Sequence, residues 1–259
     1  MPSNISQFQP KSLKYVFTDI DDTLTEDGKL YDDAYKALWD LHRAGIKVIP
    51  VTGRPAGWCE MILRVWPVEA VIGENGGFYF CFGSDGKVKR EFLTPKNVQE
   101  TNRVKLDLIK KEILREVPGT DAASDQFCRL MDLAIDFKED VPELKKSDVQ
   151  KIVDIFLKHG AQAKISSIHV NGWFGDYNKS KMIRYFCSNH LGKNFSEINE
   201  SSVFIGDSPN DEENFELFNH SVGVKNIEEF LDDMKTKPKF ITNEVGGKGF
   251  VEMTSKICS

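Results

Sequence analysis

Hydrophobic and polar positions alternate between two kinds of segment in the first part of the chain. Short apolar runs occupy residues 13–19, 46–53 and 68–76, and amphipathic stretches with helical spacing separate them at residues 31–45 and 56–67. Short apolar runs joined by helices predict parallel strands with crossover helices. Such sheets are covered on both faces, which fits unbroken apolar stretches such as VIPV and VFIG. The pattern predicts an α/β fold with a Rossmann-like parallel-sheet core and helices on both faces.

The pattern changes after Gly77. Residues 78–92 alternate around the turn sequence SDG, which predicts a β-hairpin. Longer segments follow, with the spacing of helices at residues 97–117 and 147–160 and of strands at residues 125–137 and 163–174. We therefore expect an inserted α+β domain at residues 83–173.

The first pattern resumes at Lys179. The remaining sequence predicts helices at residues 179–191 and 210–218, and strands at residues 202–207, 220–224 and 239–242. The core domain is thus expected to be discontinuous, formed by residues 1–82 and 174–259.

Composition narrows the possible partners. The 259 residues carry 34 basic and 40 acidic side chains, a net charge of −6, without the basic stripe that tracks a nucleic-acid backbone. The five cysteines are odd in number and form no CxxC pair, so neither a disulfide framework nor a structural zinc site is indicated. No signal pattern or membrane-length apolar run is present. We expect a soluble cytoplasmic protein, a monomer or small homo-oligomer, that binds neither nucleic acid nor membrane.

Aspartates crowd the ends of two predicted strands. Asp19, Asp21 and Asp22 follow the first strand, and Asp207 and Asp211 follow a later one. Functional groups of open parallel sheets gather at these carboxyl ends. Like charges held together repel, and an all-oxygen set of donors favours Mg²⁺ with a substrate phosphate. The alternative is that both segments are ordinary turns or helix caps, which Asp, Ser and Thr also favour.

Four motifs in a fixed order make the pattern specific. They are DIDDT with Asp19, Asp21 and Thr23, VTGR with Thr52, NKSK with Lys179, and GDSPND with Asp207 and Asp211. This set resembles the haloacid dehalogenase-like superfamily of phosphohydrolases, in the subgroup with a large cap (C2-type, IIB) inserted between the second and third motifs. The segments VIGENGG and KFITNEVGGKGF are similar to the branch of sucrose, trehalose and mannosylglycerate phosphatases, which is related to phosphomannomutases.

The resemblance implies a covalent mechanism. Asp19 would attack phosphorus and form an aspartyl phosphate, and Asp21 would act as general acid and then general base. Mg²⁺ would be held by Asp19, Asp207 and the backbone carbonyl of Asp21.

The resemblance also assigns supporting roles. Thr52 would donate to a phosphoryl oxygen, Lys179 would neutralise charge at the nucleophile, and Asn210 and Asp211 would orient metal-bound waters or the lysine. Lys181 competes with Lys179 for this role, but it lies about 200° round the helix axis, so we favour Lys179.

Candidate substrate-binding residues are Arg54, Arg129, His169 and Asn171. Arg54 would meet substrate or pair with a cap carboxylate. Arg129 is expected on a cap strand. Ser167, His169, Asn171 and Trp173 alternate onto one strand face that could bind sugar hydroxyls, although an ordinary half-exposed face has the same pattern.

The sequence predicts a Mg²⁺-dependent phosphatase that acts on a small phosphorylated metabolite, in particular a sugar phosphate. A phosphosugar mutase would use the same motifs, and a non-catalytic relative would bind a metabolite or a protein. A nucleotide-binding oxidoreductase is disfavoured, because the glycine clusters GENGG and GGKGF form no GxGxxG loop and are better explained as turns. Cap closure would require hinges, which we expect near Gly83 and Gly175.

Overall fold

A parallel sheet of six strands forms the centre of the core in the computed structural model, which describes residues 1–166 and 168–258. The strand order is β1-β13-β12-β11-β2-β3. The bounds are Ser3–Asn4 (β1), Phe240–Ile241 (β13), Ser221–Gly223 (β12), Ser202–Gly206 (β11), Tyr15–Thr18 (β2) and Lys47–Pro50 (β3).

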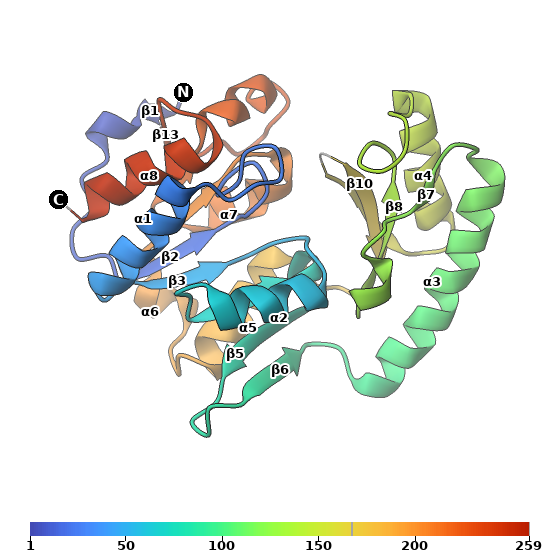
Figure 1. Cartoon of the computed structure of the whole chain (residues 1–259), viewed down its shortest axis with the longest axis horizontal. Coiled ribbons are helices and arrows are strands. Elements are labelled where there is room, and N and C mark those ends of the chain that lie inside the picture. Colours follow the sequence, from blue (N-terminus) through green and yellow to red (C-terminus); the bar gives the residue numbers. More distant parts are fainter. Residues whose placement is uncertain (167, 259) are drawn as a thin grey trace.

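Helices cover both faces of this sheet, as the apolar pattern predicted (Figure 1). Val16 of β2 packs on the face of α1 (Asp32–Arg43), α2 (Ala56–Val65) and α8 (Gly246–Ile257). The next residue, Phe17, packs on the opposite face with α5 (Lys179–Asn189), α6 (Phe195–Ile198) and α7 (Glu212–Leu217). Successive strand residues point to opposite faces, so strands apolar at every position require helices on both sides. The predicted α/β fold class is confirmed.

A hairpin extends the core beyond the parallel sheet. Strands β4 (Ala70–Gly73), β5 (Phe78–Phe82) and β6 (Val88–Phe92) form an antiparallel sheet, and Val51 bridges to Ile72 of β4. The predicted domain boundary after residue 82 falls inside this hairpin, and we place the boundary after β6. Gly83 lies in the hairpin loop, where its N–H donates to Lys87 O at 2.8 Å. It is therefore not in a connection between core and cap, and the hinge expected there is wrong.

The cap is a four-stranded antiparallel sheet with two helices on one face. Figure 1 shows the sheet turned towards the core and the helices turned away from it. The strand order β7-β8-β10-β9 comprises Asp121–Ala122 (β7), Asp132–Asp136 (β8), His169–Trp173 (β10) and Gln162–Ile165 (β9), and the helices are Lys96–Glu116 (α3) and Lys146–Lys158 (α4).

Two predicted cap strands need correction. Residues 163–174 form no single strand, because β9 and β10 pair antiparallel as a hairpin. Arg129 is not on a strand either, because it follows the 3-10 turn Gln126–Cys128 and precedes β8. Ser167, predicted to share a face with His169, lies outside the described residues.

The helix α8 is missing from the sequence prediction. The cluster GGKGF forms its first turns rather than a turn at a strand end. Glycine disfavours helices, which hid this one. A Cβ at Gly247 would lie 2.8 Å from Leu24 O, so glycine lets the helix start against the backbone that follows Asp19 and Asp21.

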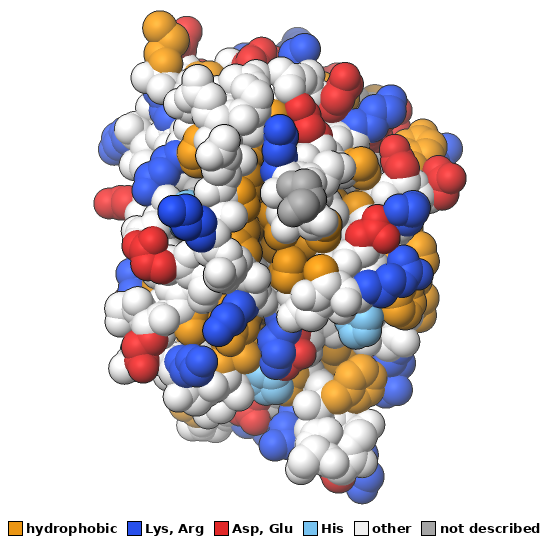
Figure 2. Space-filling model, turned by 90° about the vertical axis from the view of Figure 1, so that its left-hand side faces the viewer, with side chains coloured by type: hydrophobic (Ala, Val, Ile, Leu, Met, Phe, Trp, Pro, Cys, Tyr) orange, Lys and Arg blue, Asp and Glu red, His pale blue; other side chains and the backbone are white. Residues whose placement is uncertain are grey.

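The surface carries charges of both signs. Figure 2 shows Lys and Arg side chains interspersed with Asp and Glu over the face nearest the chain termini. Among the described residues, no helix is both long and apolar enough to cross a bilayer.

Candidate active site

Two neighbouring strand ends bring the motif aspartates together. β2 and β11 pair in parallel with Thr18 opposite Ile205, so Asp19 and Asp207 emerge at the same edge of the sheet. Oxygens of Asp19, Asp207 and Asp211 lie within 4.8 Å of one another, and all three side chains are buried. We call these three residues and Lys179 the acidic cluster.

Glycine at the end of β11 permits this approach. The side chain of Asp211 folds back over the strand end, where its Oδ2 accepts a hydrogen bond from the N–H of Asp207 at 3.2 Å. A Cβ at Gly206 would lie 2.4 Å from Asp211 Oδ2, which no side chain tolerates. The sequence GDSPND thus sets the position of both carboxylates.

Lys179 is the cation of the acidic cluster. Its Nζ donates to Asp19 Oδ1 at 2.7 Å and to Asp211 Oδ1 at 2.8 Å, and the side chain is 5% exposed. The competing Lys181 is 44% exposed and pairs with Asp176. The geometry therefore places Lys179, and not Lys181, beside the motif aspartates.

The acidic cluster holds three carboxylates against one ammonium group. Burial raises the pKa of Asp19 to about 8, although Lys179 opposes the shift. Burial and the neighbouring Asp19 also raise the pKa of Asp207 well above its ordinary value. Burial disfavours the charged form of Lys179, but Asp19 and Asp211 outweigh it and raise the pKa of the lysine. An additional cation would offset this excess of negative charge.

The donor atoms fit a hard cation. Among the described residues, none donates to Oδ2 of Asp19, and the side chain of Asp207 accepts only from Thr23 Oγ1, at 3.2 Å on its Oδ1. The nearby Asn210 has a buried Oδ1 without a hydrogen-bond partner among the described residues. Mg²⁺ and its bound waters prefer oxygen ligands, and these oxygens without hydrogen-bond donors lie at the negatively charged acidic cluster.

A cavity of about 1110 Å³ lies between core and cap, and the acidic cluster opens into it. Its walls include Asp19, Asp21 and Asp207 from the core, and His169 and Asn171 from the cap. Volumes of this size accommodate small metabolites.

Thr52 is not on the wall of this cavity. Its side chain is fully buried, and its Oγ1 accepts a hydrogen bond from the N–H of Arg54 at 3.0 Å. The following residues, Gly53 and Arg54, line the cavity instead. The contact of Thr52 with a phosphoryl group stays a prediction.

Arg54 pairs chiefly within the core. Its guanidinium donates to both carboxylate oxygens of Asp21, with distances of 2.8 to 3.0 Å. The cap carboxylate nearest to it, Glu139, is 3.8 Å from Nη1. The expected pairing with a cap carboxylate is therefore present only as a longer contact.

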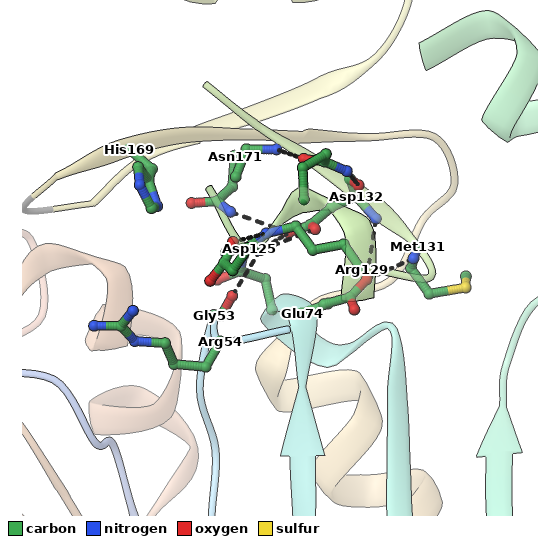
Figure 3. Close-up of polar contacts among 12 residues, drawn as sticks. Gly53, Arg54, Glu74, Asp125, Arg129, Met131, Asp132, His169 and Asn171 are labelled. Atoms are coloured by element: carbon green, nitrogen blue, oxygen red, sulfur yellow. Dashed lines mark hydrogen bonds and ion pairs between the residues drawn. The ribbon is translucent and has the colours of Figure 1, made fainter. Parts of the chain in front are cut away.

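Arg129 is buried in contacts that join cap to core (Figure 3). Its guanidinium donates to Asp125 Oδ1 and Asp132 Oδ1, each at 3.0 Å, and to the core carbonyl of Gly53 at 3.0 Å. These contacts give Arg129 a role at the interface; it also lines the cavity, and its contact with substrate stays a prediction.

Glu74 completes this interface from the core. Its buried carboxylate accepts hydrogen bonds from four backbone N–H groups, those of Ala56, Leu130, Met131 and Asp132. Three of the four belong to the cap segment that follows Arg129. Burial, and next the charge of Asp132, raise the pKa of Glu74 to about 7. We call Glu74, Asp125, Arg129 and Asp132 the cap–core joint.

His169 and Asn171 lie on β10, where all five positions are buried, so the half-exposed face considered as an alternative is absent. The Asn171 amide donates to Asp132 Oδ2 at 3.1 Å. His169 Nε2 is 3.0 Å from Glu139 Oε2 but out of line for a hydrogen bond. Burial, then the charge of Arg129, lower the pKa of His169 to about 4, so the ring is neutral at pH 7.

Sequence reasoning missed several residues around the site, namely Trp58, Glu74, Asn75 and Glu139. The segment GENGG drew attention only for its glycines, yet Glu74 and Asn75 both have positive φ, at 45° and 55°. Consecutive non-glycine residues in this region are strained and mark functional segments. Asn75 Oδ1 accepts from Asn210 Nδ2 at 3.3 Å, beside the acidic cluster. Glu139 carries no sequence signal.

Comparisons with known proteins bear on the family resemblance and on the fold. The family profile described as haloacid dehalogenase-like hydrolase matches residues 16–107. The predicted resemblance to haloacid dehalogenase-like hydrolases is confirmed. A candidate phosphatase of Streptococcus pyogenes serotype M6 is 23% identical over 274 residues, which cover 95% of this chain and 98% of that protein.

Solved structures show the shared fold over nearly the whole chain. A Thermoplasma acidophilum protein superposes with a TM-score of 0.74 at 15% identity, covering 96% of this chain and all of that one. The sucrose-phosphatase of Synechocystis sp. PCC6803, solved with sucrose and phosphate, has a TM-score of 0.64 at 16% identity, with 95% and 98% covered. The fold that this chain shares with these structures therefore includes the cap.

Proposed function

We propose that this haloacid dehalogenase-like chain is a Mg²⁺-dependent phosphatase that hydrolyses a small phosphorylated metabolite, in particular a sugar phosphate. One observation carries the proposal: Asp19 stands on the wall of a metabolite-sized cavity, with Oδ1 held by Lys179 and Oδ2 free of donors from the described residues. A carboxylate oriented on one side and open on the other is prepared to act as a nucleophile. The match to hydrolases and the similarity to a candidate phosphatase support the reaction class.

In the first step, Asp19 Oδ2 attacks phosphorus. The bond from phosphorus to the ester oxygen breaks, and Asp21 gives its proton to the departing alkoxide, so an alcohol leaves. Lys179, 2.7 Å from Asp19 Oδ1, balances the negative charge that the phosphoryl group brings. The product of this step is an aspartyl phosphate on Asp19.

In the second step, water attacks the phosphorus of the aspartyl phosphate. Asp21, now ionised, takes a proton from this water, and the bond between phosphorus and Asp19 breaks to give inorganic phosphate and the free carboxylate. Asp211 holds Lys179 in place throughout, with Oδ1 at 2.8 Å from Nζ. Asp19, Asp207 and the backbone carbonyl of Asp21 would hold Mg²⁺, which when bound offsets the charge between nucleophile and phosphoryl group.

The substrate class rests on the cavity and on the relatives. His169 and Asn171 of the cap line the same cavity as Asp19, and they would meet the part of the substrate beyond the phosphate. A related fold belongs to a sucrose-phosphatase. The proposal includes a soluble cytoplasmic enzyme, monomeric or a small homo-oligomer, with no nucleic-acid or membrane partner.

Phosphate release from a panel of sugar phosphates and one aryl phosphate, with Mg²⁺ or with chelator, tests the proposal. We expect release that requires Mg²⁺ and is lost in Asp19→Asn, and retained in Asp107→Asn, which alters an exposed aspartate of α3. Product analysis separates a mutase, which would return the phosphoryl group to the sugar. Absence of release by folded protein would favour a non-catalytic relative.

A further inference from the structure

Arg54 binds Asp21, the residue proposed to give a proton to the leaving group of the substrate. Nε of Arg54 donates to both carboxylate oxygens of Asp21 at 3.0 Å, and Nη2 donates to Oδ1 at 2.8 Å. Both oxygens of Asp21 are thus engaged, although Asp21 lies on the cavity wall. A carboxylate tied in this way is poorly placed to reach a leaving group or a water.

The position of Arg54 is itself fixed by the core. Its guanidinium carbon lies 4.5 Å from the centre of the Trp58 ring, a cation–π contact. The side chain is 10% exposed, so few rotamers are open to it. Movement of this guanidinium therefore requires a competing partner close by.

The cap supplies such a partner. Nη1 of Arg54 makes no hydrogen bond to a described residue and points to Glu139, whose Oε1 is 3.8 Å away. An approach of less than about 1 Å would convert this contact into a hydrogen bond. Next to Glu139 lies His169, whose Nε2 is 3.0 Å from Oε2 and has no hydrogen-bond partner in the described part of the chain. Figure 3 shows His169 of the cap above Arg54 of the core, on the same side of the cap–core joint.

The cap–core joint makes this distance sensitive to cap position. Arg129 of the cap binds the carbonyl of Gly53, the residue before Arg54, and Glu74 holds the cap backbone at residues 130–132. The cap is thus fastened to the core beside Arg54. The separation of Arg54 and Glu139 therefore depends on how the cap is oriented at this joint.

We propose that Arg54 is a positioning residue through which the cap controls Asp21. In the conformation described here, Arg54 binds both oxygens of Asp21. As the cap closes over substrate, Glu139 accepts a hydrogen bond from the guanidinium of Arg54. One oxygen of Asp21 is thereby released, takes up a proton from solvent and turns to the ester oxygen. Proton transfer is then available only when the cavity is closed around a substrate. This inference rests on the proposed function, because it concerns the acid of that reaction.

The test compares two esters in a double-mutant cycle. Dinitrophenyl phosphate has a leaving group that needs no proton, whereas a hexose phosphate from the panel needs one. We expect Glu139→Gln to lower kcat/KM for the hexose phosphate by about 10-fold and for dinitrophenyl phosphate by less than about twofold. In a background of Arg54→Gln, the same change at Glu139 should have no further effect, because the residue through which it acts is gone. Asp140→Asn, an exposed neighbour in the same cap loop, is the matched control.

Two results would overturn the inference. Equal losses with both esters would show that Glu139 affects binding or folding rather than proton transfer. Additive losses in the double variant would show that Glu139 does not act through Arg54. A wild-type protein that releases phosphate from neither ester would instead overturn the proposed function, and this inference with it.

Discussion

Two charge clusters with the same number of charges adjoin the cavity. Each contains three carboxylates and one cation. The acidic cluster comprises Asp19, Asp207, Asp211 and Lys179, and the cap–core joint comprises Glu74, Asp125, Asp132 and Arg129. Their hydrogen bonding differs sharply.

In the cap–core joint, every carboxylate oxygen accepts a hydrogen bond from a described residue. Glu74 accepts from four backbone N–H groups, and Asp132 is bound by Arg129 and by the Asn171 amide. In the acidic cluster, Lys179 engages one oxygen of Asp19 and one of Asp211, while Oδ2 of Asp19 faces the cavity without a donor from the described residues. Buried charge is costly unless it is paired. The cap–core joint, whose carboxylates are fully hydrogen-bonded, connects cap and core. The acidic cluster, which has an oxygen without a donor, is suited to bind a cation and a phosphate.

Loss of the cation from the acidic cluster has the largest predicted effect. Lys179→Met should lower phosphate release by roughly 10²–10³-fold, since a preorganised charge beside the nucleophile is removed. Lys181→Met, which alters the exposed lysine two residues on, should change the rate less than twofold, a change of only about 0.4 kcal/mol. Steady-state phosphate release measures both, and a larger loss in Lys181→Met would contradict our placement of the roles.

Loss of the cation from the joint should act on stability. Arg129→Met leaves Asp125 and Asp132 buried without their partner, and we expect the free energy of unfolding to fall by about 3–5 kcal/mol in urea titrations. Arg115→Met, at an exposed arginine of α3, should fall within about 0.5 kcal/mol of wild type. Equal stability of these two variants would show that the joint does not hold the cap.

Mg²⁺ should distinguish the clusters directly. At about 100 times its dissociation constant, a ligand of the native state adds about 2.7 kcal/mol, which raises the melting temperature. We expect this rise in wild type and in Glu74→Gln, because the joint has no vacant oxygens, and its loss in Asp207→Asn. A rise that survives Asp207→Asn would place the ion elsewhere.

His169 should give the smallest effect, through pH. Its pKa in the folded state is about 4, below the ordinary value of 6.5, so the unfolded chain binds the proton more tightly. Stability is then complete above pH 6.5 and is lost as pH falls towards 4. Between pH 7.5 and 5, wild type should lose roughly 1–2 kcal/mol more than His169→Gln in urea titrations. Parallel losses in both proteins would contradict the burial of a neutral ring.

Much of the fold could be predicted because its signals are local. Unbroken apolar strands and amphipathic helices gave the α/β core, and DIDDT and GDSPND marked strand ends that parallel pairing must bring together. The helix at GGKGF could not be predicted, because the close contact of Gly247 with Leu24 overrides glycine's low propensity.

The cap–core joint could not be predicted at all. Glu74 is held by backbone N–H groups, which every residue possesses and no sequence motif marks. The interface contacts of Arg129 have no sequence signal either, since nothing in the sequence shows that Asp125, Asp132 and Gly53 converge on it. Contacts between distant segments depend on tertiary packing, whereas the motif residues are recognised by their order along the chain.

Mass spectrometry of acid-quenched reactions tests the central claim most directly. Wild-type protein mixed with Mg²⁺ and dinitrophenyl phosphate should carry one phosphoryl group on the peptide that contains Asp19, and Asp19→Asn should carry none. Metal-dependent phosphate release without any phosphoryl group at Asp19, under conditions that accumulate the intermediate, would contradict the account of this carboxylate as the nucleophile.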